Sequence, residues 1–182
     1  MGIFLSFLPW IVFWVLSGRD NYEIAALAAV AAVLFLNIRD MRRRSMKILD
    51  VGTLVCFLLL VLVGFTSEAK WIDHYAAPLS NAALFVIALV SILIRRPFTL
   101  QYAREQVDPK FWNTPGFYSV NLAISSVWCA AFAVTAILSY LYIRHPNSID
   151  WVIHILVFVG AIKFTAWYPE YAKAKAAGNA GT

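Results

Sequence analysis

Polar side chains recur at helical spacing inside the long apolar stretches of this chain, and these are the groups that could bind a ligand. Asn121 and Ser125 lie four residues apart, so they share one helical face, and Trp128 follows on the same face. Asn81 holds a comparable place in the preceding apolar stretch. Inside a bilayer such groups hydrogen-bond between helices, and they can equally line a path for a ligand or an ion. The spacing leaves both interpretations open, a packing face or a ligand site.

Four ionisable side chains also fall inside the apolar stretches, each near an end of its stretch. They are Glu23, Asp50, His154 and Lys163. A carboxylate suits the first turn of a helix, which accounts for Glu23 and Asp50 close to water, and Lys163 can extend toward the interface. An ion pair between Lys163 and Asp50 is the sharper alternative. Because no charge is expected at the centre of the bilayer, the sequence disfavours a proton relay or an ion-coupled carrier.

The chain carries none of the short motifs that mark a catalytic or cofactor site. It has no G-x-S-x-G, HExxH or P-loop motif, and no zinc-ligand spacing. Its three histidines are too few for a membrane di-metal enzyme and do not pair at one depth for haem. We therefore expect no metal and no cofactor, and the sequence favours a non-enzymatic protein.

Six apolar stretches must position these side chains. Hydrophobic residues make up 62% of the 182 residues and charged residues only 14%, which is outside the usual range for a soluble domain. A helix of about 20 apolar residues crosses the hydrocarbon core of a bilayer. The sequence predicts an all-α, polytopic transmembrane bundle that forms a single domain. The predicted spans are residues 3–17, 21–38, 48–65, 77–94, 118–143 and 151–168.

The positive charges predict the orientation of this bundle. Twelve basic residues fall in alternate gaps, near the end of the sixth span and in the tail, and three fall on the opposite side. The twelve are Arg39, Arg42, Arg43, Arg44, Lys47, Arg95, Arg96, Arg104, Lys110, Lys163, Lys173 and Lys175, and the three are Arg19, Lys70 and Arg144. Because basic loops stay cytoplasmic, both termini are expected in the cytoplasm. The net charge of +5 then reflects topology, and we expect no nucleic-acid binding.

Residues 95–117 form the longest segment between two spans. Pro97 can end the preceding span and open a new turn. A short amphipathic helix is expected from Phe98 to Val107 on the cytoplasmic surface, with Phe98 and Tyr102 facing the membrane. The basic residues Arg95, Arg96 and Arg104 are candidates for binding anionic lipid head groups.

A short motif occurs twice at a predicted return to the cytoplasm. Residues 98–102 and residues 164–168 both read F-T-x-x-Y. Tandem hairpins that leave and re-enter the cytoplasm would give this pattern, and transporters are often built from repeats. Three matched residues leave the existence of true repeats open.

The order of these segments is similar to that of the intracellular septation protein A family of bacterial inner-membrane proteins. The resemblance rests on Phe7-Leu8-Pro9, residues 21–29, Trp71 ahead of residues 81–89, Arg95-Arg96-Pro97, and Asn121-Leu122-Ala123 before Trp128 and Phe132. It implies a multi-pass inner-membrane protein that acts in cell-envelope maintenance and division through other membrane proteins, with no enzymatic activity assigned. No binding residues carry over from it.

Two functions follow from these patterns. The first is a non-enzymatic integral membrane protein that acts through other membrane proteins or through self-association. The second is a small transporter, channel or lipid-binding protein with its site between the fourth and fifth spans, at Asn81, Asn121, Ser125 and Trp128. A cavity lined by these residues would favour the second function, and tight packing there would oppose it.

Overall fold

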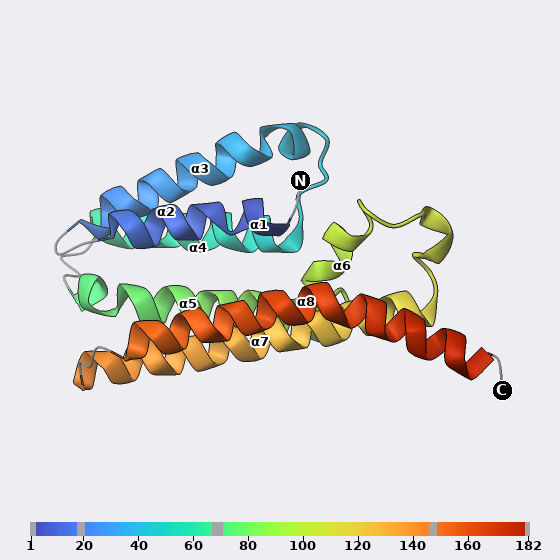
Figure 1. Ribbon diagram of the computed structural model, residues 1–182. Coiled ribbons are helices and arrows are strands. Elements are labelled where there is room, and N and C mark those ends of the chain that lie inside the picture. The colour runs from blue at the N-terminus through green and yellow to red at the C-terminus, as the bar shows by residue number, and fades with distance from the viewer. Residues whose placement is uncertain (1–2, 18–20, 67–70, 146–148, 181–182) are drawn as a thin grey trace.

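The computed structural model describes residues 3–17, 21–66, 71–145 and 149–180, and every regular element in those ranges is a helix (Figure 1). The elements are α1 (Ile3–Ser6), α2 (Leu8–Leu16), α3 (Tyr22–Arg42), α4 (Ile48–Thr66), α5 (Trp71–Leu93), α6 (Phe98–Ala103), the 3-10 turn η1 (Pro109–Phe111), α7 (Pro115–Arg144) and α8 (Asp150–Ala180). The all-α prediction is therefore confirmed.

Four helices are long and apolar enough to cross a membrane. They comprise residues Tyr22–Arg42, His74–Leu93, Pro115–Arg144 and Trp151–Ala176, which belong to α3, α5, α7 and α8. The stretches predicted at residues 3–17 and 48–65 form shorter apolar helices, Ile3–Leu16 and Ile48–Gly64. Four candidate spans are thus established, whereas the count of six and the cytoplasmic placement of the termini stay predictions.

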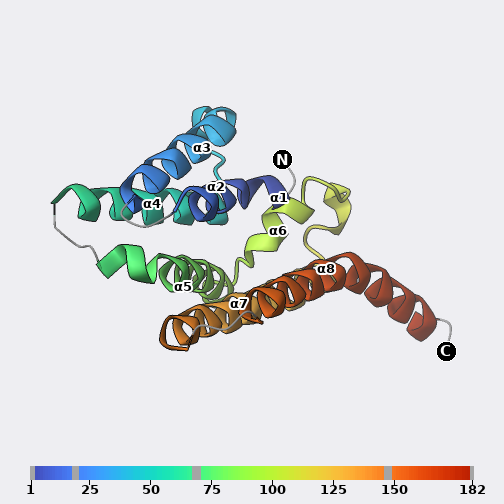
Figure 2. The same ribbon diagram turned by 60° about the vertical axis from the view of Figure 1, so that its left-hand side comes forward.

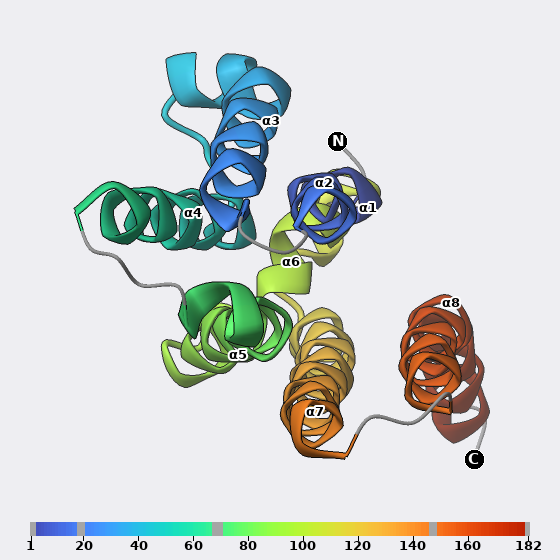
Figure 3. The same cartoon turned by 90° about the vertical axis from the view of Figure 1, so that its left-hand side faces the viewer.

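The helices lie roughly along one direction in two groups (Figures 1 and 2). Helices α1 to α4 form one group, and α5, α7 and α8 form the other. The end-on view shows α6 between the two groups, next to α2 of the first group (Figure 3). The start of α1 and the end of α8 lie at the end of the bundle that also holds α6 (Figure 1). We call this the α6 end.

Aromatic side chains of α2 and of the residue before it fill the centre of the molecule. Phe7 stacks on Trp128 of α7 with ring centroids 5.2 Å apart, and Trp10 packs on Phe57 of α4 at 4.7 Å. Trp10 and Trp14 also donate hydrogen bonds from Nε1, to Thr53 at 2.9 Å and to Ser80 at 2.8 Å. The shortest predicted stretch is therefore the one that joins the two groups of helices.

Small residues allow neighbouring helices to approach closely. Ala25 and Ala29 of α3 are fully buried. Gly52 of α4 lies so close to α5 that a Cβ atom there would come within 2.7 Å of Cγ1 of Ile87. In contrast, a Cβ atom at Gly160 of α8 would meet nothing. Close packing thus holds α3, α4 and α5, whereas much of α8 faces outward.

Candidate functional site

The short helix α6 is buried in the bundle. Helix α5 ends at Leu93, and Arg95 adopts the left-handed conformation with φ 57°. The amide of Arg96 then donates to the carbonyl of Ser91 at 2.8 Å, which closes the end of α5 before Pro97 redirects the chain. Phe98 is 0% exposed and Tyr102 is 3% exposed. The prediction that these two side chains face the membrane is wrong, because they pack against protein instead.

Polar contacts join α6 to α7. Oγ1 of Thr99 donates to the carbonyl of Asn121 at 3.0 Å and lies 2.9 Å from Oγ of Ser125. Both Thr99 and Ser125 are buried. The side-chain amide of Asn121 donates back to the carbonyl of Phe117 at 2.8 Å. Two of the predicted candidate residues, Asn121 and Ser125, therefore anchor α6.

The opposite side of α6 is held by the first group of helices. Tyr102 donates to Oγ of Ser6 at 2.8 Å, and Oε1 of Gln101 accepts from the amide of Ile48, the first residue of α4, at 2.7 Å. Burial, followed by the nearby charge of Asp50, raises the pKa of Tyr102 well above its ordinary value, so the phenol stays a hydrogen-bond donor. Helix α6 thus bridges the two groups of helices.

An ion pair between the buried Lys47 and the exposed Glu105 follows directly after α6. Nζ of Lys47, in a side chain only 6% exposed, lies 2.8 Å from Oε1 of Glu105 and 3.9 Å from Oδ2 of Asp40. It also lies 4.9 Å from the ring centroid of Tyr102. Partial burial acts to raise the pKa of Glu105. The hydrogen bond and the positive charge of Lys47 act in the opposite direction, and the pKa ends below its ordinary value.

Asp50 lies inside this same cluster. It is 2% exposed, and the hydroxyl of Ser6, the ammonium of Lys47 and the amide of Asn37 all act on its carboxylate. Asp50 does lie in the first turn of α4, as expected, but the expectation that it is close to water is wrong, because α1, α3 and α6 cover it. The alternative pair with Lys163 is also wrong, since Lys163 is exposed on α8 and Lys47 is the lysine beside Asp50.

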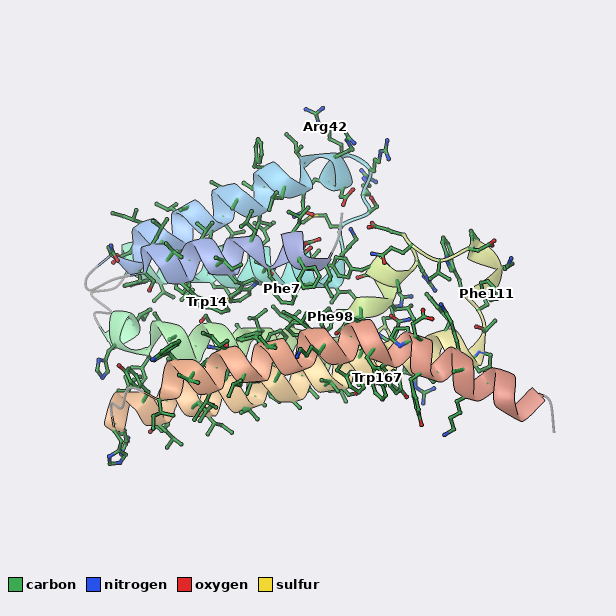
Figure 4. All side chains as sticks on the ribbon, in the orientation of Figure 1. Phe7, Trp14, Arg42, Phe98, Phe111 and Trp167 are labelled. Carbon is green, nitrogen blue, oxygen red and sulfur yellow. The ribbon has the colours of Figure 1, made fainter. Side chains whose placement is uncertain are left out.

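The chain beyond α6 is exposed but internally braced. We call residues 104–114 the presented loop. Nε1 of Trp112 donates to the carbonyl of Val107 at 2.8 Å, and the guanidinium of Arg104 lies 5.6 Å from the Trp112 ring centroid. Nζ of Lys110 lies 4.9 Å from the ring centroid of Phe111. Phe111 itself is 47% exposed and points away from the helices (Figure 4).

The remaining candidate residues join α5, α7 and α8. Oγ1 of Thr135 donates to Oδ1 of Asn81 at 3.0 Å, and Ser139 shares a 3.0 Å hydrogen bond with Nε2 of His154. Nε1 of Trp128 donates to Oγ1 of Thr165 at 3.0 Å. At 1.5 Å per residue, Ser125 and Ser139 lie about 21 Å apart along α7. The four candidates thus belong to three separate sets of hydrogen bonds rather than to one site.

In both copies of the F-T-x-x-Y motif, the threonine makes a hydrogen bond to α7. Thr99 in the first copy bonds to Ser125, and Thr165 in the second accepts from Trp128, so both threonines lie against α7. The candidate lipid-binding residues Arg95, Arg96 and Arg104 are exposed. They lie on either side of α6.

No family model, curated protein or solved structure matches this chain. The resemblance to the septation protein A family therefore stays a prediction that is based on the sequence motifs alone. Among the residues that the structure describes, no group of three or more His, Cys, Asp or Glu side chains is arranged to hold a metal ion.

The buried cluster at the α6 end is the functional candidate that sequence reasoning missed. One signal was available, since Thr99 places a polar group on the apolar face of α6 and a face turned to lipid would not favour it. Another was Lys47, directly before an apolar helix and three residues before Asp50. Neither signal identifies which residues contact Thr99 or Lys47, because the contacts of the cluster come from segments up to 96 residues apart.

Proposed function

We propose that this chain is a non-enzymatic integral membrane protein that acts by binding other membrane proteins, with the presented loop as its main contact surface. The observation that carries the proposal is the docking of α6. Hydrogen bonds from Thr99 and Tyr102 and the ion pair between Lys47 and Glu105 hold the base of an otherwise exposed loop. A loop fixed before binding loses little conformational entropy when a partner arrives.

The composition of the loop suits recognition of a protein. It exposes one large aromatic side chain, Phe111, beside the charged groups of Arg104, Asp108 and Lys110. Aromatic and arginine side chains contribute most of the energy at protein interfaces. Asp108 accepts from the amide of Lys110 at 3.0 Å, so the turn that carries Phe111 is itself defined.

Helix α8 supplies a second contact surface, within the plane of the membrane. It packs on α7 along one side, through Ala161 and the bonds to Trp128 and Ser139. Its other side carries the exposed residues Trp151, Ile155, Leu156, Val159, Ile162 and Trp167. Such a surface fits another transmembrane helix as well as it fits lipid. In keeping with the family resemblance, we place the function in envelope maintenance or division at the bacterial inner membrane.

Affinity purification in mild detergent tests this function. We compare the wild-type protein with Phe111→Ala and Lys110→Glu, and use Val86→Ala as the control because Val86 is an exposed side chain on α5. We expect a reproducible set of membrane proteins with the wild type and the control, and its loss with both loop variants. Recovery of the same set with the loop variants would contradict the proposal.

A second candidate, lipid binding, is favoured by a groove between α5 and α7. The groove has a volume of about 480 Å³, and its lining is apolar: Tyr75, Pro78, Leu79, Ala82, Ala136, Ile137 and Tyr140. Nη2 of Arg144 donates to the hydroxyl of Tyr140 at 3.0 Å, so a cation lies beside one lining residue. An acyl chain in the groove with an anionic head group near Arg144 would match this arrangement.

Filling the groove tests the second candidate. Ala136→Phe should displace a lipid that remains bound to the wild-type protein in native mass spectrometry. Val134→Phe, at a neighbouring exposed position, is the matched control and should leave the lipid bound. Equal lipid retention by both variants would rule out this groove as the site.

A further inference from the structure

Asp50 stands out as a buried acid whose carboxylate is incompletely satisfied. Its side chain is 2% exposed, and its Oδ2 atom has no hydrogen-bond partner among the described residues. A buried carboxylate that keeps its charge needs several donors or a close cation, because losing its hydration is costly. An acid in such a place takes up a proton unless its neighbours supply those partners.

The neighbours of Asp50 come from four segments, and they satisfy its carboxylate only in part. Ser6 on α1 and Asn37 on α3 donate hydrogen bonds to the carboxylate, but both groups are neutral, and Oδ2 stays without a partner among the described residues. The amide of Asn37 also donates to the carbonyl of Val33 at 3.1 Å. The charged groups acting on Asp50 are Asp40 on α3 and Lys47 before α4. From α6 comes the phenol of Tyr102, whose hydrogen bond goes to Ser6.

Among the residues that the structure describes, Lys47 is the cation that acts on Asp50, and two other carboxylates lie close to it. Its ammonium lies 2.8 Å from Glu105 and 3.9 Å from Asp40. If all three acids were ionised, three negative charges would lie around the buried ammonium of Lys47. Protonation of the most buried of them relieves that repulsion, as in other sites where like charges meet.

We propose that Asp50 is a proton-binding site of the docked α6, and that release of the proton favours undocking of α6 and the presented loop. Tyr102 and Glu105 lie over the cluster from α6 and the residues after it. When α6 lifts away, water reaches Asp50 and the ionised form becomes stable. Docking and proton binding therefore support each other by thermodynamic linkage.

The direction of the pH effect follows from this linkage. Because the docked state holds the extra proton on Asp50, a rise in pH favours the undocked state. At low pH a second group weakens the docking of α6, because protonation of Glu105 removes its ion pair with Lys47. Docking is thus strongest at intermediate pH. The consequence for partner binding rests on the proposed function, whereas the proton site does not.

Infrared spectroscopy tests the proton site directly. The purified protein in lipid should show the carbonyl stretch of a protonated carboxylic acid at neutral pH. The band should be absent in Asp50→Asn and present in the control Asp108→Asn, whose carboxylate is exposed and lies outside the cluster. In the wild-type protein, isotopically labelled aspartate should shift the band, which assigns it to an aspartate even if Asp50→Asn does not fold; of the described aspartates, Asp50 is the buried one. A missing band, or a band that survives Asp50→Asn, would overturn the proposal.

Hydrogen exchange of the α6 amides tests the coupling. After correction for the intrinsic effect of pH on exchange, protection of residues 98–103 in the wild type should fall as pH rises above neutral. In Asp50→Asn, which cannot ionise, the protection should not change over the same range, and Asp108→Asn, at an exposed carboxylate outside the cluster, should behave as the wild type. If protection in the wild type is independent of pH, or if Asp50→Asn loses protection equally, Asp50 does not control docking. Infrared spectroscopy and hydrogen exchange need no partner protein, so failure of this proposal can be distinguished from failure of the proposed function.

Discussion

The hydroxyl of Tyr102 on α6 donates to Oγ of Ser6 on α1 at 2.8 Å, and this bond joins positions 96 residues apart in the chain. It links the first element to the segment between α5 and α7. Together with the bond from Thr99 to the carbonyl of Asn121, it fixes α6 from both sides. The direction of the presented loop depends on these two contacts.

Tyr102→Phe should weaken this link without removing the ring. Ser6 loses its buried donor, so we expect the free energy of unfolding to fall by about 1 kcal/mol. The measurement is thermal unfolding in one fixed detergent. Tyr118→Phe is the control, because Tyr118 is only half-buried at the start of α7. An equal loss in both variants would mean that the bond to Ser6 contributes nothing specific.

Ser125 and Ser126 form a matched pair on α7. Ser125 is fully buried against Thr99, whereas Ser126 is exposed and donates to the carbonyl of Leu122 in its own helix. Ser125→Leu should lower the free energy of unfolding by about 1–3 kcal/mol through overpacking alone. Ser126→Leu should change it by less than about 0.5 kcal/mol. A stable Ser125→Leu protein would show that this face of α7 looks outward to lipid.

Glu105 should make α6 docking sensitive to acid. Because its pKa is lowered in the folded protein, its ion pair with Lys47 is fully present above the ordinary value of 4.5 and is lost as pH falls through the lowered value. We expect Glu105→Gln to abolish this part of the pH dependence of stability. The exposed pair of Glu170 and Lys173, at 2.7 Å, is the comparison. Glu170→Gln should leave the profile unchanged, since exposed pairs contribute little.

Two glycines should respond to alanine in opposite directions. At Gly52 the new Cβ atom would come within 2.7 Å of Ile87, so α4 and α5 must separate or Ile87 must shift. We expect Gly52→Ala to destabilise the protein. Gly160 faces open space within α8, so Gly160→Ala should stabilise it by about 0.5–1 kcal/mol through helix propensity. Equal effects, measured by thermal unfolding, would contradict the close approach of α4 and α5.

Arg95 occupies a backbone conformation that suits glycine. Its φ is 57°, a region that costs a residue with a Cβ atom about 1–2 kcal/mol. Arg95→Gly should therefore raise the stability of the protein and lower its retention of anionic lipid. Arg96→Gly is the control, because Arg96 has no positive φ and should show no gain in stability. A loss of stability in Arg95→Gly would show that its side chain makes contacts that outweigh the strain.

Hydropathy and spacing predicted the helical class and placed Asn121 and Ser125 on a buried face of α7. They could not show whether protein or lipid covers such a face. The period of α6 groups Phe98 with Tyr102, but lipid and protein both suit these residues, and the choice depends on partners far away in the chain, such as Ser6 for Tyr102. Asp50 was misjudged for the same reason, since its cover comes from α1, α3 and α6.

The first apolar stretch shows a second limit. Residues 3–17 form the shortest predicted span, and they contain Pro9. Their rings nonetheless fill the centre of the molecule, through Phe7 on Trp128 and Trp14 on Phe158. Length and hydropathy describe how a segment meets lipid, whereas its role in the core depends on the shape of its neighbours.

Photo-crosslinking in living cells tests the central claim most directly. A photoreactive residue replaces Phe111 or Lys110 in the presented loop, and Val86 on α5 serves as the comparison site. We predict one discrete protein adduct common to both loop positions, absent at Val86 and lost when Tyr102→Ala frees α6. No adduct from the loop, or the same adduct from Val86, would contradict the proposal that the docked loop is the partner-binding surface.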